Sequence, residues 1–211
     1  MRLIAGLFRL AAAAASIMGT YNTWSGAKAW DWVYFTNQSN IVFAFVMLWA
    51  GAATLVRGMQ PPAWLKGCIT LYMAITGLVA WLILPPAVMG PDTLYFFGLP
   101  TATLVHVVAP IAAVADFLLL DEHRRFKWHY PLTWLLYFPA YLAMVLIRAA
   151  FFPDQPLPSG AMYPYPFVDV AAIGWAQLGV NAVTYLGAFL LGGLALFLID
   201  RILPARTFAN L

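Results

Sequence analysis

Six long apolar stretches constrain the fold of this chain more than any other feature of its sequence. They lie at about residues 3–20, 33–56, 62–84, 99–120, 131–152 and 171–199. A helix needs roughly 20 mostly apolar residues to cross a bilayer, because the hydrocarbon core is about 30 Å thick and each residue rises about 1.5 Å. With 64% hydrophobic and 9% charged residues, the 211-residue chain has too little polar surface for a water-soluble fold. We therefore predict an all-α integral membrane protein, with six transmembrane helices in one compact bundle and a single domain over residues 1–211.

The distribution of Lys and Arg predicts the orientation in the membrane, since cytoplasmic connections carry an excess of both. They gather near both chain ends and in the second and fourth connections, at Arg2, Arg9, Arg57, Lys66, Arg124, Arg125, Lys127, Arg201 and Arg206. The first connection has only Lys28, and the third and fifth carry Asp92, Asp154 and Asp169 instead. This pattern predicts that both termini are cytoplasmic. The net charge of +3 comes from these scattered cations, so we expect no nucleic-acid partner.

Polar residues inside the apolar stretches are costly and need a partner or a function. Thr36, Asn40, His106, Arg148 and Asn181 all fall within about 10 Å of the predicted outer helix ends, counting 1.5 Å per residue. Such residues often serve only as interhelical hydrogen-bond partners, worth roughly 0.6–2 kcal/mol each. A membrane-embedded histidine must be either hydrogen-bonded or titratable, so His106 is the strongest functional candidate among them.

Pro110 predicts a distortion of the fourth helix. A proline inside a helix cannot donate to the carbonyl four residues earlier, and that carbonyl belongs to His106. We expect the helix to bend at His106.

Two further expectations concern charged and proline-rich segments. Arg9 and Asp116 have similar inner depths, which favours a structural ion pair, with a cytoplasmic-side proton or ion site as the alternative. The fifth connection, residues 153–170, has five prolines and cannot be helical, so its aromatic run Tyr163–Phe167 is placed to plug the outer mouth of the bundle.

Cys68 is the only cysteine, and no metal-binding or cofactor-binding motif has usable context. We therefore expect neither a metal nor a cofactor.

Three short segments resemble the androgen-induced-gene (FAR-17a-like) family: Trp32–Thr36, His106–Pro110 and Tyr165–Asp169. Small bacterial six-span relatives share the hydropathy over nearly the full chain, which implies the same fold in a bacterial cytoplasmic membrane. Animal members are membrane-embedded threonine hydrolases that cleave fatty acid esters of hydroxy fatty acids with one Thr and one His. By motif match, the resemblance places these catalytic roles on Thr36 and His106.

The leading hypothesis is thus a lipid-ester hydrolase, whose partners are membrane lipids and a hydrophobic ester substrate. Candidate substrate or oxyanion ligands are Asn37, Asn40, Arg148, Gln177 and Asn181. One alternative is a non-catalytic protein that binds lipids or small hydrophobic molecules. Another is a proton-coupled transporter using His106, Asp116 and Arg148, which the absence of a detectable inverted repeat disfavours. The sequence does not indicate an oligomeric state.

Overall fold

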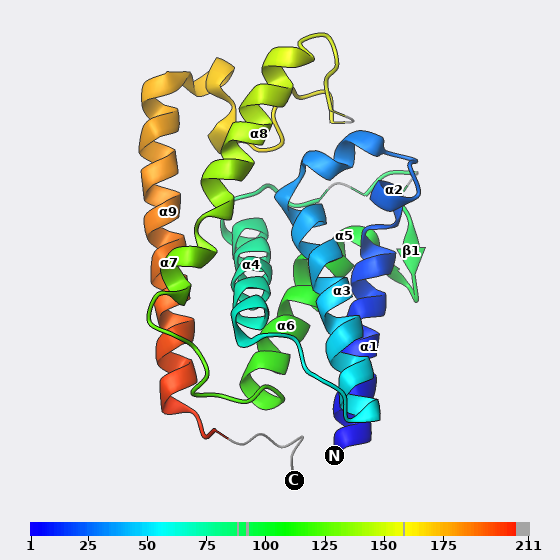
Figure 1. Cartoon of the computed structure of the whole chain (residues 1–211). Helices are drawn as coiled ribbons and strands as arrows, with labels where there is room; N and C mark the ends of the chain where they lie inside the picture. The colour runs from blue at the N-terminus through cyan, green and yellow to red at the C-terminus, as the bar shows by residue number, and fades with distance from the viewer. Residues whose placement is uncertain (88, 92, 158, 206–211) are drawn as a thin grey trace.

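A computed structural model describes residues 1–87, 89–91, 93–157 and 159–205. Six helical segments are long and apolar enough to cross a membrane, which confirms the number predicted from the sequence (Figure 1). They are Arg2–Gly19, Phe35–Val56, Ala63–Leu82, Thr101–Leu119, Tyr130–Phe151 and Val170–Ile202. Asp92, Pro158 and Arg206, which entered the topology and loop predictions, lie outside the described residues.

The six spans and the connections between them contain the following elements. The first three are α1 (Arg2–Gly19), α3 (Phe35–Val56) and α4 (Ala63–Leu82), with α2 (Tyr21–Trp24) and the 3-10 turn η1 (Ala29–Val33) between α1 and α3. A short hairpin of β1 (Tyr95–Phe96) and β2 (Leu99–Pro100) precedes α5 (Thr101–Thr103), the π-helical turn η2 (Leu104–Val108) and α6 (Ala109–Leu119). The chain continues through α7 (Tyr130–Trp134), α8 (Tyr137–Phe151), the 3-10 turn η3 (Pro166–Val168) and α9 (Val170–Ile202).

Two predicted helix starts were wrong by two residues. The second span begins at Phe35 and not at residue 33, because Tyr34 is extended (φ −74°, ψ 127°) after the η1 turn. The fourth begins at Thr101 and not at residue 99, because Leu99 and Pro100 pair antiparallel with Phe96 and Tyr95. The α9 helix is longer than the predicted 171–199 and ends at Ile202.

The distortion expected at His106 takes the form of a π-helical turn, Leu104–Val108. At its end the Ala109 N–H bonds to the Leu104 carbonyl, five residues earlier, and Pro110 follows with no N–H to donate. Gly77 of α4 lies against this turn: a Cβ there would be 3.0 Å from Pro110 Cβ and 3.4 Å from His106 O. Such π turns within α-helices are frequently found at functional sites.

The fifth span is also interrupted, which the predicted single helix over residues 131–152 did not include. It divides into α7 and α8 at Leu135 and Leu136. Pro139 has no N–H for the Leu135 carbonyl, which instead accepts a tighter bond from Phe138 N–H at 3.1 Å. The proline therefore ends one helix and begins the next.

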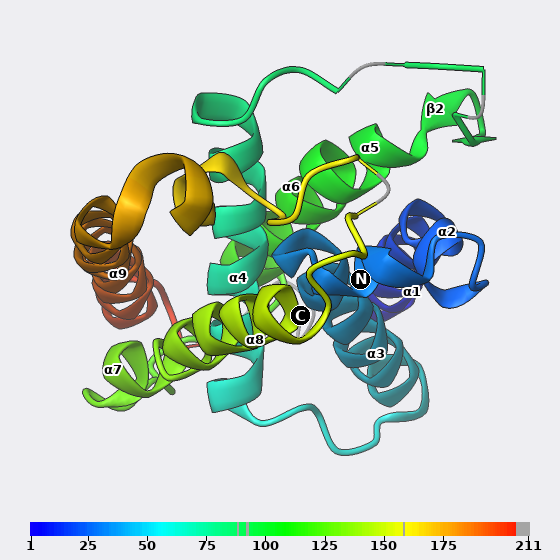
Figure 2. The same ribbon diagram turned by 90° about the horizontal axis from the view of Figure 1, so that it is seen from above.

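The spans lie side by side, with α4 and α6 between two outer groups (Figures 1 and 2). Viewed from above, α1 and α3 lie on one side and α7, α8 and α9 on the other (Figure 2). The α9 helix buries only 11% of its most apolar stretch, so most of its surface is available to lipid. The first residue and the C-terminal end of α9 lie at the same end of the molecule (Figure 1).

The start of α9 is set by a cap and a kink. Asp169 Oδ1 accepts hydrogen bonds from the N–H groups of Ala171 and Ala172 at 3.1 and 3.2 Å. Gly174 then has φ 77° and ψ 163°, a conformation that is essentially restricted to glycine. The first turn of α9 therefore runs at an angle to the rest of the helix (Figure 1).

We predict that Gly174→Ala destabilises the protein by about 1–3 kcal/mol, measured as thermal unfolding in detergent. A Cβ at Gly174 would meet nothing within 4 Å, so the effect would come from the backbone alone. The matched control is Gly179→Ala, at a helical position of α9 where a Cβ is equally unobstructed. Equal melting temperatures for the two variants would contradict this account of the kink.

Candidate active site

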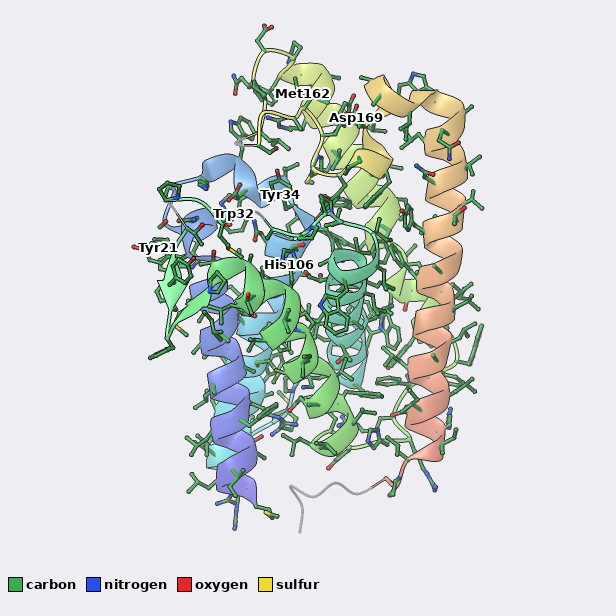
Figure 3. All side chains as sticks on the ribbon, turned by 180° about the vertical axis from the view of Figure 1, so that it is seen from behind. Tyr21, Trp32, Tyr34, His106, Met162 and Asp169 are labelled. Atoms are coloured by element: carbon green, nitrogen blue, oxygen red, sulfur yellow. The ribbon has the colours of Figure 1, made fainter. Side chains whose placement is uncertain are left out.

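Thr36 and His106 lie together at one end of the spans. Thr36 is buried in the first turn of α3, and its Oγ1 lies 3.4 Å from His106 Nε2 on the π-helical turn. In Figure 3, His106 lies in the same half of the molecule as Tyr34 and Asp169. The two residues that the family resemblance singled out are therefore in hydrogen-bonding reach of each other.

The tautomer of the imidazole decides the role of His106 Nε2 in this contact. In the neutral ring one nitrogen carries the proton and the other is an acceptor. With the proton on Nδ1, Nε2 can accept the proton of the Thr36 hydroxyl.

Tyr165 is the third side chain at this position. Its hydroxyl accepts a hydrogen bond from Thr36 N–H at 3.3 Å and lies 3.4 Å from Thr36 Oγ1. Tyr165 lies outside the membrane-spanning segments, and burial raises the pKa of its phenol above the ordinary value. The hydroxyl therefore keeps its proton at neutral pH. The sequence indicated Tyr165 only as part of an aromatic run. Its partner Thr36 is 129 residues away in the chain, so no local sequence pattern could predict their contact.

Asn40 holds the surrounding backbone together. Its Nδ2 donates to Thr36 O at 2.9 Å and to Val105 O at 3.2 Å, while its Oδ1 accepts from Ser16 Oγ at 2.9 Å. Both amide hydrogens are therefore used, and Asn40 has none left for an oxyanion. Asn40 instead fixes α3 against α1 and the π-helical turn.

The other polar candidates share the depth of Thr36 but bond elsewhere. Asn37 Nδ2 donates to Asp31 O at 2.9 Å, and the exposed Gln177 donates to Asn181 Oδ1 at 2.9 Å. Asn181 Nδ2 in turn donates to Phe167 O at 2.9 Å. Of the residues that the structure describes, none of these three is hydrogen-bonded to the Thr36 hydroxyl. The expected single polar cluster is therefore divided.

Arg148 has a separate environment near the fifth connection. It donates to the carbonyls of Met162, at 3.0 Å, and Gln155, and its guanidinium lies 4.6 Å from the centre of the Trp30 ring. These bonds tie the fifth connection to α8. Arg148 therefore holds the fifth connection against α8, and no hydrogen bond joins it to Thr36.

An apolar cavity of about 220 Å³ lies between α4, α8 and α9, and Thr36 is among its lining residues. Its lining includes Ile75, Val79, Phe138, Leu142, Leu178, Leu186 and Phe189. The polar residues in its lining are Thr36, Thr76, Tyr141, Tyr165, Asn181 and Tyr185. His106 is not among the lining residues, so it approaches the Thr36 hydroxyl from outside this cavity.

Neither protein-family models, nor curated proteins, nor solved structures gave a match to this chain.

At the opposite end, four charged groups form a network. Arg9 Nε donates to Asp116 Oδ1 at 2.7 Å and Arg9 Nη2 to Asp121 Oδ1 at 2.9 Å. Lys66 Nζ bonds to Asp116 and lies 3.3 Å from Asp121 Oδ2. The sequence indicates the Arg9–Asp116 pair, and places Lys66 among the cations of the second connection. It does not single out Asp121. In the described ranges, no group of three or more His, Cys, Asp or Glu side chains is arranged to hold a metal ion.

We predict that Asp116→Asn destabilises the protein by about 3–5 kcal/mol, because Arg9 and Lys66 would then share one remaining carboxylate in a buried site. Thermal unfolding in detergent measures the change. Glu122→Gln, at an exposed position whose ion pair with Arg125 spans 3.4 Å, should leave the melting temperature unchanged. An Asp116→Asn protein of unchanged stability would contradict a structural role.

Proposed function

We propose that this protein is a membrane-embedded ester hydrolase that uses Thr36 as nucleophile and His106 as general base. The observation that carries this proposal is the 3.4 Å approach of His106 Nε2 to the Oγ1 of Thr36, a residue that lines an apolar cavity. A threonine hydroxyl is a weak nucleophile until a base within hydrogen-bond reach takes its proton.

In the first half of the reaction, His106 Nε2 takes the hydroxyl proton as Thr36 Oγ1 attacks the ester carbonyl carbon. The tetrahedral intermediate then collapses, and the bond to the alcohol oxygen breaks. His106 returns the proton to that oxygen, so the alcohol leaves neutral and the acyl group stays on Thr36.

In the second half, water replaces the alcohol. His106 takes a proton from the water as its oxygen attacks the acyl carbon. Collapse of the second intermediate breaks the bond to Thr36 Oγ1, which recovers its proton from His106. The product is the free acid, and the protein returns to its starting state.

Tyr165 is the group best placed to stabilise the oxyanion of both intermediates. Its protonated hydroxyl lies 3.4 Å from Thr36 Oγ1, the atom that bonds to the carbonyl carbon. A preorganised donor at this position gains most where water is excluded, and Tyr165 is buried.

The substrate class follows from the shape of the cavity and from the family resemblance. The cavity is mostly apolar and lies between helices, which suits an acyl chain better than a polar ligand. We therefore propose a lipid ester, with fatty acid esters of hydroxy fatty acids as the class that the resemblance implies.

The proposed orientation puts both termini in the cytoplasm and the Thr36 end near the outer leaflet of a bacterial cytoplasmic membrane. Six crossings would return the chain to its starting side of the membrane. The first residue and the end of α9 lie at the same end of the molecule, which is consistent with this (Figure 1). The Lys and Arg distribution supports this direction.

One observation favours a second candidate, a lipid-binding protein without catalysis: His106 does not line the apolar cavity. In that case Thr36 and Asn181 would only bind a head group. The transporter hypothesis has less support, since Asp116 is held by Arg9 and Lys66 while Arg148 bonds to loop carbonyls.

We predict that Thr36→Val abolishes hydrolysis of lipid esters and covalent labelling by a hydrolase-directed probe, because it removes the nucleophile and keeps the side-chain shape. Thr36→Ser should retain part of both activities. His106→Ala should lower the rate roughly 10²- to 10⁴-fold. The double variant should be no worse than Thr36→Val alone, because the two residues act in the same steps. The control is Thr184→Val, an exposed position on α9 whose hydroxyl bonds only to its own helix among the described residues. Wild-type hydrolysis by a folded Thr36→Val protein would refute the assignment.

We also predict that Tyr165→Phe lowers kcat roughly 10²- to 10³-fold with little change in KM, because an oxyanion donor acts mainly in the transition state. Steady-state kinetics on the purified protein measure the two constants. Tyr163→Phe, in the same aromatic run, serves as the matched control. An increase in KM alone would show that the Tyr165 hydroxyl contributes to binding and not to the chemical step.

A further inference from the structure

A second cavity, of about 770 Å³, lies at the opposite end of the molecule from Thr36. It is formed by the start of α1, the end of α3 with the connection to α4, and the segment that follows α6. These elements meet at the lower end of the view in Figure 1, the end proposed to face the cytoplasm. Unlike the cavity at Thr36, this inner cavity has a largely polar lining.

The charges of the inner cavity do not balance. Five cations and two acids line it: Arg2, Arg9, Arg57, Lys66 and Arg125, with Asp121 and Glu122. Arg9 and Lys66 are offset by Asp116 and Asp121, and Arg125 pairs with Glu122. The charges of Arg2 and Arg57 remain without an ion pair among the described residues, and both side chains are exposed.

The buried network makes a rigid wall for this cavity. The Arg9 guanidinium bonds to Asp116, Asp121, Thr54 Oγ1 at 2.7 Å, Gln60 Oε1 at 3.2 Å and Leu120 O at 3.1 Å. These partners occupy the donors of Arg9. Arg2 and Arg57 make no side-chain hydrogen bond among the described residues, so their donors are available to a ligand, as are those of Arg125 other than Nη1.

Arg57 is held in an unusual backbone conformation. It ends α3 in the left-handed region (φ 59°, ψ 34°), where glycine or asparagine is usual at a helix C-terminus. Gly58 N–H closes the helix by bonding to Ala53 O at 2.8 Å. A long charged residue thus occupies a backbone position that favours a small one, and Arg57 borders the inner cavity.

We propose that the inner cavity binds a phosphate group, with Arg2 and Arg57 as its ligands. A guanidinium offers paired N–H donors that match two phosphate oxygens, and its charge remains at every physiological pH. Arg2 is the first residue of α1, at the membrane edge where phospholipid phosphates lie. Anionic lipids of the cytoplasmic leaflet are one source of the phosphate, and free inorganic phosphate is the other. This site is independent of Thr36 and His106.

The test uses the full chain in a non-ionic detergent and isothermal titration with three probes. They are a short-chain phosphatidylglycerol, the diacylglycerol with the same chains but no phosphate, and inorganic phosphate. We expect Arg57→Asn, which suits the left-handed backbone, to weaken binding roughly fivefold, and the same for Arg2→Gln. The double variant should be weakened roughly 25-fold. Lys127→Gln, an exposed charge change at the same end outside the cavity, is the matched control and should bind as the wild type does.

Each result has a defined meaning. Arginine-dependent binding of phosphatidylglycerol but not of inorganic phosphate supports the site and identifies a lipid head group as its source. Arginine-dependent binding of inorganic phosphate at similar affinity supports the site and identifies free phosphate. The proposal is overturned if neither binds, if diacylglycerol binds as tightly as phosphatidylglycerol, or if Lys127→Gln weakens binding as much as Arg57→Asn. Melting temperatures of all variants exclude unfolding as the cause.

Discussion

Hydrocarbon supplies no hydrogen-bond partners, so each polar group within the spans has to be satisfied by the protein itself. Asn40 shows this constraint most directly, because one side chain bonds to Ser16 of α1, to Thr36 of its own helix and to Val105 of the π-helical turn. These bonds fix three segments against one another around Thr36. The geometry of the candidate nucleophile therefore depends on a residue that takes no part in the proposed chemistry.

The same constraint separates the two ends of the molecule. Around Thr36 itself, neutral side chains and backbone groups bond to one another, and the cavity between α4, α8 and α9 is mostly apolar. At the other end, two cations and two carboxylates compensate each other, and a polar cavity opens beside them. The acyl chain and the phosphate group that we propose as ligands would thus bind at opposite ends of one set of helices.

Much of the architecture could be predicted from the sequence, because crossing a bilayer imposes length and apolarity on each helix. The number of spans and the distortion near Pro110 follow from local rules of this kind. The depth of each residue in the membrane could also be counted along its helix. The sequence could not show which neighbouring helix each polar side chain would face. Arg148 and Asn181 therefore share the depth of Thr36 without contacting it, while Tyr165 reaches it from a connection. Lys66 was taken for a connection charge because it lies near a predicted helix start, although it is buried against Asp116.

The position of the apolar cavity determines the route by which a substrate would reach it. Its walls are transmembrane helices, and α9, the outermost of them, exposes most of its apolar surface. A long-chain ester dissolved in the bilayer would meet Thr36 by diffusing in two dimensions, without first entering water. The quantity that governs occupancy is then the mole fraction of ester in the membrane, and diluting the vesicles in buffer would leave the turnover of each protein molecule unchanged.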